Sequence, residues 1–335
     1  MTAAEKPDAD IIRQQVAALR AAQWLGARRW WPEYLFHFAD LRNVVSILQE
    51  GALLSRTEMR ARQANFTDAA SHEVLGWTDD RWKQYARFYF RPRTPMLYRN
   101  EGFRPRERQW QGAHCPVPVY LLFDLEAILC RADSRFSDGN LANTLSERVE
   151  VNIFDNAADF ERLPFDLIYH DSRVPPEERN KIISHRHAEV IVPQRVELDS
   201  LRLIWCRSQA EYETLRFLLP DALWRQWRDK ITARTDYNLF NREWVHVEQV
   251  TLTSTHISFR FNPCRKPEDA GWFNLRGEVM DMASGSTHRW EAKDVELKQR
   301  LKVELPYRSR DYTVQLFIDD HLAYASRYQE DNLPF

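Results

Sequence analysis

Glycine is scarce in this sequence. It accounts for 9 of the 335 residues, which is less than half of the share of about 7% in an average protein. Neither glycine-rich phosphate loop, G-x-G-x-x-G or G-x-x-x-x-G-K-[ST], occurs in the chain. This absence argues against an ordinary Rossmann enzyme and against a P-loop nucleotide hydrolase. A protein of this composition that binds a nucleotide must hold it without those loops.

The four cysteines are widely spaced and form no C-x-x-C pair. Their spacing predicts neither a disulfide framework nor a zinc cluster. No run of about 18 apolar residues occurs, and the first thirty residues lack a basic start followed by an apolar core. We therefore expect a soluble, cytoplasmic protein that does not associate with a membrane.

The net charge of −2 also gives no sign of a polyanionic partner, but it conceals a strongly basic segment. Residues 81–110 contain nine basic and two acidic residues, interleaved with aromatic ones. Arginine forks bind phosphates and aromatic rings stack on bases, so the segment is typical of a surface for single-stranded nucleic acid or a dinucleotide. The alternative is a solvated arginine-rich face over core aromatics.

Hydrophobic patterning divides the chain into a mixed part and a β-rich part. In the mixed part, Asp40 and Gly51 are the expected N-cap and stop of a helix over 40–48. Further helices are expected at 10–29, 140–148 and 209–232, and buried strands at 85–90, 117–124, 188–192 and 201–206.

The β-rich part predicts seven short strands of a small antiparallel sandwich. They are expected at 246–252, 256–262, 273–282, 286–293, 299–305, 311–318 and 321–328. We expect an N-terminal helical extension (1–34), a central domain (35–240) and a β-rich accessory domain (241–335). Most of Trp272, Phe273, Trp290 and Tyr312 are expected in its core.

Two titratable residues stand out for chemistry. His37 follows an apolar run and precedes a helix, where it can contact a ribose hydroxyl, act as a base or be structural. Glu189 opens an apolar strand, where a carboxylate is costly unless it is functional or paired, for instance with Arg186. His185 and His187 have no third ligand at a suitable spacing, so no metal is expected.

Two other carboxylates favour structural interpretations. Asp138 lies in a turn sequence, Phe-Ser-Asp-Gly-Asn, and is expected to cap a helix or stabilise the turn. Glu101 is expected to fix Arg99 rather than to take part in chemistry.

Four segments in order, 37–56, 87–102, 135–140 and 185–193, resemble the DarT family of NAD-dependent nucleic-acid ADP-ribosyltransferases. The resemblance covers about residues 35–210. It implies an α+β fold: an ADP-ribosyltransferase-like split antiparallel β core with flanking helices, joined here to a C-terminal all-β sandwich-like domain. NAD+ would be the substrate, and no metal is implied.

The resemblance also implies roles for individual residues. The catalytic residues would be Glu189, His37 and Arg93. The residues that hold NAD+ would be His37, Asn43, Ser46, Arg56, Tyr89, Arg91 and Tyr98. For the nucleic-acid strand, the expected contacts are Arg87, Arg99, Arg104, Arg186 and His187.

The resemblance implies a toxin that transfers ADP-ribose to a guanine or thymine of single-stranded DNA, in a toxin–antitoxin or phage-defence system. Its partner would be an antitoxin, macrodomain-type or chaperone-assisted. His187 disfavours an arginine-modifying E-x-E toxin, and Arg87 before Phe-Tyr-Phe favours the guanine branch. Alternatives are the same chemistry on RNA, an NAD glycohydrolase or protein-directed transferase, and a non-catalytic module that binds single strands. The β-rich domain is expected to dock an antitoxin, a chaperone or a phage component.

Overall fold

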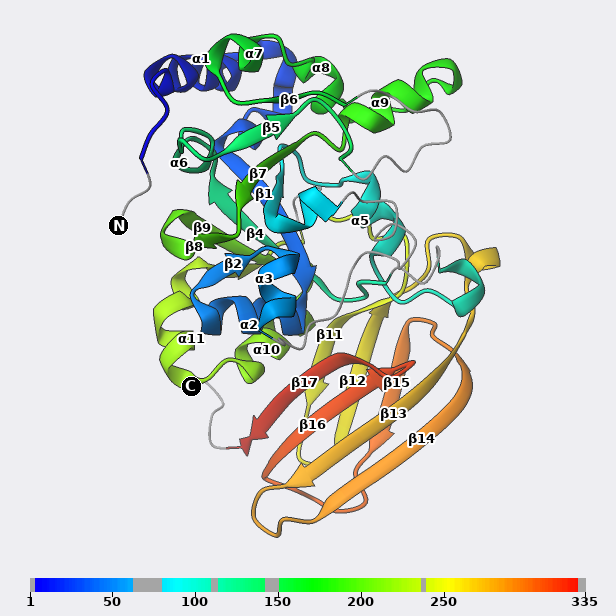
Figure 1. Ribbon diagram of the computed structural model, residues 1–335. Coiled ribbons are helices and arrows are strands. Elements are labelled where there is room, and N and C mark those ends of the chain that lie inside the picture. Colours follow the sequence, from blue (N-terminus) through cyan, green and yellow to red (C-terminus); the bar gives the residue numbers. More distant parts are fainter. Residues whose placement is uncertain (1–3, 63–79, 110–113, 142–150, 236–238, 331–335) are drawn as a thin grey trace.

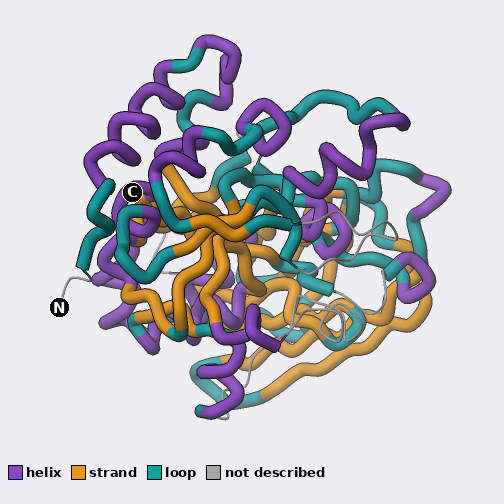
Figure 2. The backbone as a smooth tube through the Cα atoms, turned by 45° about the horizontal axis from the view of Figure 1, so that its top comes forward, coloured by secondary structure: helices purple, strands orange, loops and turns teal. Residues whose placement is uncertain are grey.

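The computed structural model describes residues 4–62, 80–109, 114–141, 151–235 and 239–330. Figure 1 shows a mixed α/β part in the upper half of the view and a sandwich of long strands below it. In the tube view, strands occupy the middle of the molecule and most helices lie around them (Figure 2). Within the described residues, no helix is long and apolar enough to cross a membrane.

An eight-stranded sheet forms the centre of the mixed part, in the order β10-β9-β4-β1-β3-β7-β5-β6. The pairings are antiparallel except for β10 with β9. The strands are β1 (Tyr34–Asp40), β3 (Tyr85–Tyr89), β4 (Pro118–Asp124), β5 (Arg135–Ser137), β6 (Ile153–Phe154), β7 (Glu189–Pro193), β9 (Leu201–Cys206) and β10 (Ile231–Ala233).

The sheet is nearly divided in two between β1 and β3. These strands share a single registered pair, Phe36 with Tyr89, whereas β1 pairs with β4 along its whole length. The expected split antiparallel core with flanking helices is therefore present. A separate two-stranded sheet is formed by β2 (Ala52–Leu54) and β8 (Arg195–Glu197).

The helix after β1 has the expected signals at both ends. The Asp40 side chain accepts a hydrogen bond from the Arg42 amide at 3.1 Å, and Gly51 adopts the left-handed conformation with φ 71°. The helices are α1 (Ala9–Ala21), α2 (Leu41–Glu50), α3 (Arg56–Ala61), α5 (Pro95–Asn100), α6 (Leu125–Leu129), α7 (Ala157–Glu161), α8 (Phe165–Ile168), α9 (Arg179–His185), α10 (Gln209–Leu218) and α11 (Asp221–Trp227). Short 3-10 turns occur at Gln23–Arg28, Trp31–Glu33, Asp80–Gln84, Arg106–Arg108, Pro176–Glu178, Leu198–Ser200, Arg228–Lys230 and Pro267–Asp269.

Two expected helices are shorter than predicted. The one over 209–232 breaks at Pro220, because proline lacks the amide hydrogen that continues a helix, and its last residues form β10 instead. The one over 10–29 ends at Ala21 and continues as a 3-10 turn in which Gly26 has φ 54°. The helix expected at 140–148 falls almost entirely outside the described residues.

All seven strands expected in the β-rich part are present. They are β11 (His246–Leu252), β12 (His256–Asn262), β13 (Trp272–Asp281), β14 (Thr287–Glu296), β15 (Arg300–Glu304), β16 (Asp311–Ile318) and β17 (His321–Gln329). They form a three-stranded sheet, β11-β12-β15, and a four-stranded sheet, β14-β13-β16-β17. Residues of β16 alternate between buried and half-buried, as two packed sheets require.

The aromatic residues of the sandwich are only partly in its core. Phe273 and Tyr312 are buried, whereas Trp272 is 64% exposed. Trp290 is half-buried and its ring lies against Gly277, where a Cβ atom would come within 2.1 Å of the ring. Glycine is required there because the indole occupies the space of a side chain.

The sandwich and the mixed part are held together by α10 and a buried carboxylate. Tyr324 of β17 donates a hydrogen bond to Glu213 at 2.9 Å, and the Ala325 amide donates to the Thr214 hydroxyl at 3.1 Å. Glu101, at the end of α5, accepts hydrogen bonds from the backbone amides of residues 241 and 242 at 2.7 and 2.9 Å. This junction fixes the position of the sandwich beside the central sheet.

Candidate functional site

Glu189 is fully buried at the start of β7, directly after α9. The guanidinium of Arg87 donates two hydrogen bonds to its carboxylate, from Nε to Oε2 at 2.5 Å and from Nη2 to Oε1 at 2.6 Å. The Glu189 amide donates to the Ser137 hydroxyl at 3.1 Å. The suggested partner Arg186 is wrong, because its guanidinium instead contacts His170 Nδ1 at 2.6 Å.

Burial and ion pairing act in opposite directions on this carboxylate. Burial raises the pKa of Glu189, and the Arg87 charge and hydrogen bonds lower it. The Arg87 side chain is 24% exposed while Glu189 is fully covered. Arg87 is therefore the accessible end of a buried charged pair.

Arg87 also contacts the second candidate, His37 of β1. The Nδ1 atom of His37 lies 3.0 Å from the Arg87 carbonyl oxygen, so Nδ1 carries the hydrogen and Nε2 is an acceptor. Burial lowers the pKa of His37, and the backbone hydrogen bond partly offsets this. His37 is therefore a neutral imidazole with an acceptor nitrogen, joined to Glu189 through one arginine.

Tyr89 lies opposite Glu189 in the β3–β7 register. It is 7% exposed, and its ring stacks on Phe38 with 6.3 Å between centroids. Its hydroxyl lies 3.5 Å from the sulfur of Met96. Burial raises the pKa of Tyr89, so its hydroxyl stays protonated and is available as a hydrogen-bond donor.

A cavity of about 430 Å³, called here the His37 cavity, lies between β1, α2, β2 and α3. It brings together three of the residues expected to bind the dinucleotide, His37, Asn43 and Ser46. Arg56 opens α3, and Met59 of this helix and Arg62 just after its end form part of the wall. The lining combines a few polar groups with aliphatic side chains, as in small-molecule sites.

A larger cavity of about 910 Å³, called here the arginine cavity, shares no lining residue with the first. Four expected site residues line it, Arg91, Arg93, Tyr98 and Arg186. The remaining lining residues are Pro95, Asp171, Ser172, Arg173, Val174, Pro176, Arg179, Ile183, Asn241, Glu243 and Arg265. Both the mixed part and the β-rich part thus contribute to it.

Arg91 and Arg93 differ in how they sit at the arginine cavity. Arg91 is 1% exposed, and its guanidinium donates to the Pro92 and His170 carbonyls and to Asp171. Arg93 has φ 53°, a strained conformation for a residue other than glycine. Its amide is held by the Tyr120 hydroxyl at 2.9 Å.

Of the residues expected to contact a nucleic-acid strand, two are buried and Arg99 is half-buried. Arg104 is 6% exposed, donates to the carbonyls of Tyr98 and Glu101, and lies 4.7 Å from the ring centroid of Trp244. His187 is 8% exposed, and burial lowers its pKa to about 4. For Arg99, burial lowers the pKa and the neighbouring Arg179 lowers it further.

Sequence reasoning missed the partner of Glu101. Its carboxylate accepts from Arg207 Nη1 at 3.2 Å rather than fixing Arg99, and Arg207 also donates to Glu211 at 3.0 Å through Nε. The only signal for this pairing in the sequence is the position of Arg207, a charged residue that directly follows the buried strand β9. Asp138 lies in a bend directly after β5, and its carboxylate accepts hydrogen bonds from the backbone amide and the side-chain amide of Asn152, each at 3.0 Å.

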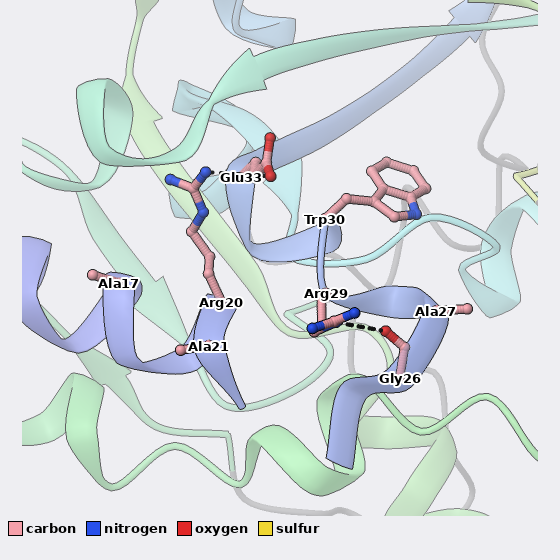
Figure 3. Close-up of a pocket in the computed structure, with 8 residues that line it drawn as sticks. All are labelled: Ala17, Arg20, Ala21, Gly26, Ala27, Arg29, Trp30 and Glu33. Carbon is pink, nitrogen blue, oxygen red and sulfur yellow. Dashed lines mark hydrogen bonds and ion pairs between the residues drawn. The ribbon is translucent and has the colours of Figure 1, made fainter. Parts of the chain in front are cut away.

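A third cavity, of about 670 Å³, lies in the N-terminal region between α1 and the turn before β1 (Figure 3). Its arginines have partners inside the cavity: Arg20 pairs with Glu33 at 3.2 Å, and Arg29 donates to the Gly26 carbonyl at 3.3 Å. It contains none of the expected catalytic residues. Across the described part of the chain, no group of three or more histidines, cysteines and carboxylates forms a possible metal site.

Comparisons with known proteins point to one family. The family described as "ssDNA thymidine ADP-ribosyltransferase, DarT" matches residues 36–238. Among solved structures, Thermus sp. 2.9 DarT in complex with ADP-ribosylated ssDNA is 20% identical and matches over 61% of this chain and 95% of its own, with a TM-score of 0.47. Thermosipho africanus DarTG in complex with ADP-ribose is 18% identical over 66% and 53%, also with a TM-score of 0.47. Among curated protein sequences, none matches this chain.

Proposed function

The chain belongs to the DarT family, and from that membership we propose that it transfers ADP-ribose from NAD+ to a base of single-stranded DNA. The observation that carries the proposal is the buried Arg87–Glu189 pair with His37 attached to it. A charged pair that is costly to bury, on the two strands that follow the division of the sheet, is typical of a catalytic site.

In the proposed reaction the bond between nicotinamide and the ribose C1′ breaks, and nicotinamide leaves with the electron pair. The positive charge that develops on the ribose resembles that in glycoside hydrolysis and needs a nearby carboxylate. Glu189 supplies the negative charge. Arg87, the accessible end of the pair, is the group that meets the entering base and orients it. A nitrogen of the base attacks C1′, and the proton of that nitrogen passes to the Glu189 carboxylate.

We assign the nicotinamide-side ribose to the His37 cavity. The acceptor nitrogen of neutral His37 suits a ribose hydroxyl, and Asn43 and Ser46 add polar groups on the facing helix. The aliphatic wall formed by Ile47 and Leu53 suits the flat nicotinamide ring. The predicted contacts of Arg56 and Tyr89 with NAD+ belong to the same proposal. Arg91 and Tyr98, which the resemblance also assigns to NAD+, line the separate arginine cavity.

We further propose that the protein is a toxin with a cognate antitoxin. We also propose that the chain divides into an N-terminal extension (1–34), the central domain (35–240) and the accessory domain (241–335). In this proposal the accessory domain docks the antitoxin. A truncated chain ending near Asn241 would be a poor test, because Glu101 would lose the Arg242 amide and α10 would lose the strand that packs on it. Substitutions on the sandwich surface are better suited to that question.

The function is tested by incubating the full chain with NAD+ labelled in its adenosine and with single-stranded DNA or RNA of the same sequence. Nucleosides from the treated polymers are then identified by mass spectrometry. We expect an ADP-ribosylated deoxynucleoside, and the mass identifies thymidine or deoxyguanosine. A modified ribonucleoside would favour the RNA alternative. Labelled protein or free ADP-ribose without a modified polymer would contradict both.

A further inference from the structure

We infer that the accessory domain and the central domain together build a phosphate-binding site for the polynucleotide strand, in the arginine cavity. This inference rests on the proposed function, since it names how that same enzyme holds its polymer. The accessory domain contributes Asn241, Glu243 and Arg265 to the cavity, and the central domain contributes the other twelve lining residues. The polymer would therefore cross from one domain to the other.

The cavity contains a large excess of positive charge. Six arginines line it against two carboxylates, Asp171 and Glu243. Asp171 pairs with Arg91 at 3.0 Å and with Arg93 at 3.7 Å, and Glu243 pairs with Arg265 at 2.6 Å. Among the described residues, no carboxylate forms an ion pair with the three other arginines of the lining, Arg173, Arg179 and Arg186.

Two guanidinium N–H groups in this cavity have no acceptor. The Nε atoms of Arg93 and Arg186 are shielded from solvent and have no hydrogen-bond partner among the described residues. A buried donor without an acceptor costs free energy, which an anionic ligand would recover. Phosphate oxygens suit arginine best, because the planar guanidinium forms paired hydrogen bonds with them.

The electrostatics of the cavity agree with an anionic ligand. Burial lowers the pKa of Arg186, and the neighbouring Arg93 lowers it further, while Asp171 opposes both. Like charges are thus crowded together at reduced solvation, and a phosphate group would relieve their repulsion.

Phosphate groups are present in both the polynucleotide and the diphosphate of NAD+. Two observations favour the polynucleotide. The arginine cavity shares no residue with the His37 cavity and has about twice its volume. Tyr98, at its edge, is 54% exposed and offers a ring on which a base can stack.

The test compares Arg265→Ala with Arg289→Ala in the full chain. Both arginines are mostly exposed and each pairs with one glutamate of the accessory domain, at 2.6 and 2.8 Å, but only Arg265 lines the cavity. Affinity for a fluorescent single-stranded DNA oligonucleotide is measured by anisotropy at several salt concentrations, without NAD+. We expect Arg265→Ala to weaken binding about threefold to tenfold and to reduce the salt slope by about 0.7, the value for one lost phosphate contact.

Glu243→Gln tests the same site with the opposite sign. Removing this carboxylate is expected to tighten oligonucleotide binding and steepen the salt dependence, which a purely structural role would not produce. Oligonucleotide affinities equal to that of the unchanged protein in both Arg265→Ala and Glu243→Gln would overturn the inference. So would a raised KM for NAD+ with unchanged oligonucleotide affinity, since the site would then hold the diphosphate.

Failure of this inference and failure of the proposed function are distinguishable. If the unchanged protein binds the oligonucleotide through Arg265 but transfers no ADP-ribose, the proposed function fails and the phosphate site stands. If the unchanged protein transfers ADP-ribose to DNA while Arg265→Ala and Glu243→Gln bind the oligonucleotide normally, the proposed function stands and the phosphate site fails. Thermal melting of each variant checks that the exposed substitutions leave the fold intact.

Discussion

The central sheet and the accessory sandwich differ in where their ion pairs lie, which is in the interior of the first and on the surface of the second. In and around the central sheet, the side chains of Glu189, Arg207 and Glu211 are 0–1% exposed although charged. In the sandwich, ion pairs such as Arg289 with Glu278 lie on the surface, with exposed fractions of 70% and 30%. Along β16 buried residues alternate with half-buried ones, and the buried Asp281 of β13 accepts hydrogen bonds from the Ser284 and Ser309 hydroxyls rather than from a cation.

This difference indicates that the buried charges of the central domain serve its function rather than its stability. Moving two charges out of water costs more than their attraction returns, so a buried pair is weak evidence for stability. Breaking such a pair is nevertheless expensive, because the remaining charge stays buried. A domain that needs only a stable fold can avoid buried ion pairs, and the described residues of the sandwich contain none. The central domain retains them where the proposed chemistry and the junction are located.

The largest expected effect comes from the catalytic candidate. Glu189→Gln keeps the shape of the side chain and removes its charge, so ADP-ribose transfer should fall by about 10³-fold while the protein stays folded. The matched control, Glu278→Gln, changes a surface partner of Arg289 and should leave transfer unchanged. Transfer assays and thermal melting distinguish the outcomes. Retained activity in Glu189→Gln would remove this residue from the catalytic role.

The next effect concerns the junction. Arg207→Met leaves the carboxylates of Glu101 and Glu211 buried without their cation, which should lower the free energy of unfolding by about 3–5 kcal/mol. Chemical denaturation measures this loss. Triple replacement of all three residues by apolar side chains of similar size should recover much of it. A stable single variant would mean that the junction charges are solvated in solution.

A smaller, pH-dependent effect is expected at the start of α2. Burial raises the pKa of Asp40 to about 6, and the Arg42 amide opposes this. A raised pKa means that the folded state binds a proton more tightly than the unfolded state, so Asp40 destabilises the protein progressively as the pH rises from about 4 to 6. Asp40→Asn keeps the cap, and should stabilise the protein by up to about 3 kcal/mol at pH 8 and not below pH 4. Equal gains at both pH values would contradict this.

The smallest effect is expected on the sandwich surface. Arg327→Ala removes two hydrogen bonds to Asp311, of 2.7 and 2.6 Å, yet the melting temperature should not change measurably because exposed pairs are screened by water. A clear fall in the melting temperature would show that the sandwich depends on its surface charges.

Local sequence patterns predict the helices and strands of this protein well. They do not predict which side chains from distant parts of the sequence form pairs. The cap at Asp40, the stop at Gly51 and all seven sandwich strands follow from residue preferences over a few positions. The Arg87–Glu189 pair does not, because β3 and β7 bring together residues 102 positions apart. The register of two strands depends on the whole sheet. The same reason explains why Glu101 was paired with its neighbour Arg99 rather than with Arg207.

The contact between α10 and β17 has a consequence for how the protein is made. Thr214 is synthesised 111 residues before Ala325, whose amide it holds. While the ribosome produces the intervening strands, the face of α10 that β17 will cover remains exposed to solvent. The Glu101 carboxylate also lacks its backbone hydrogen-bond donors until residues 241 and 242 have been synthesised. A nascent chain that already contains every proposed catalytic residue is thus still incompletely packed. The order of translation itself would delay complete packing of the central domain until β17 has left the ribosome.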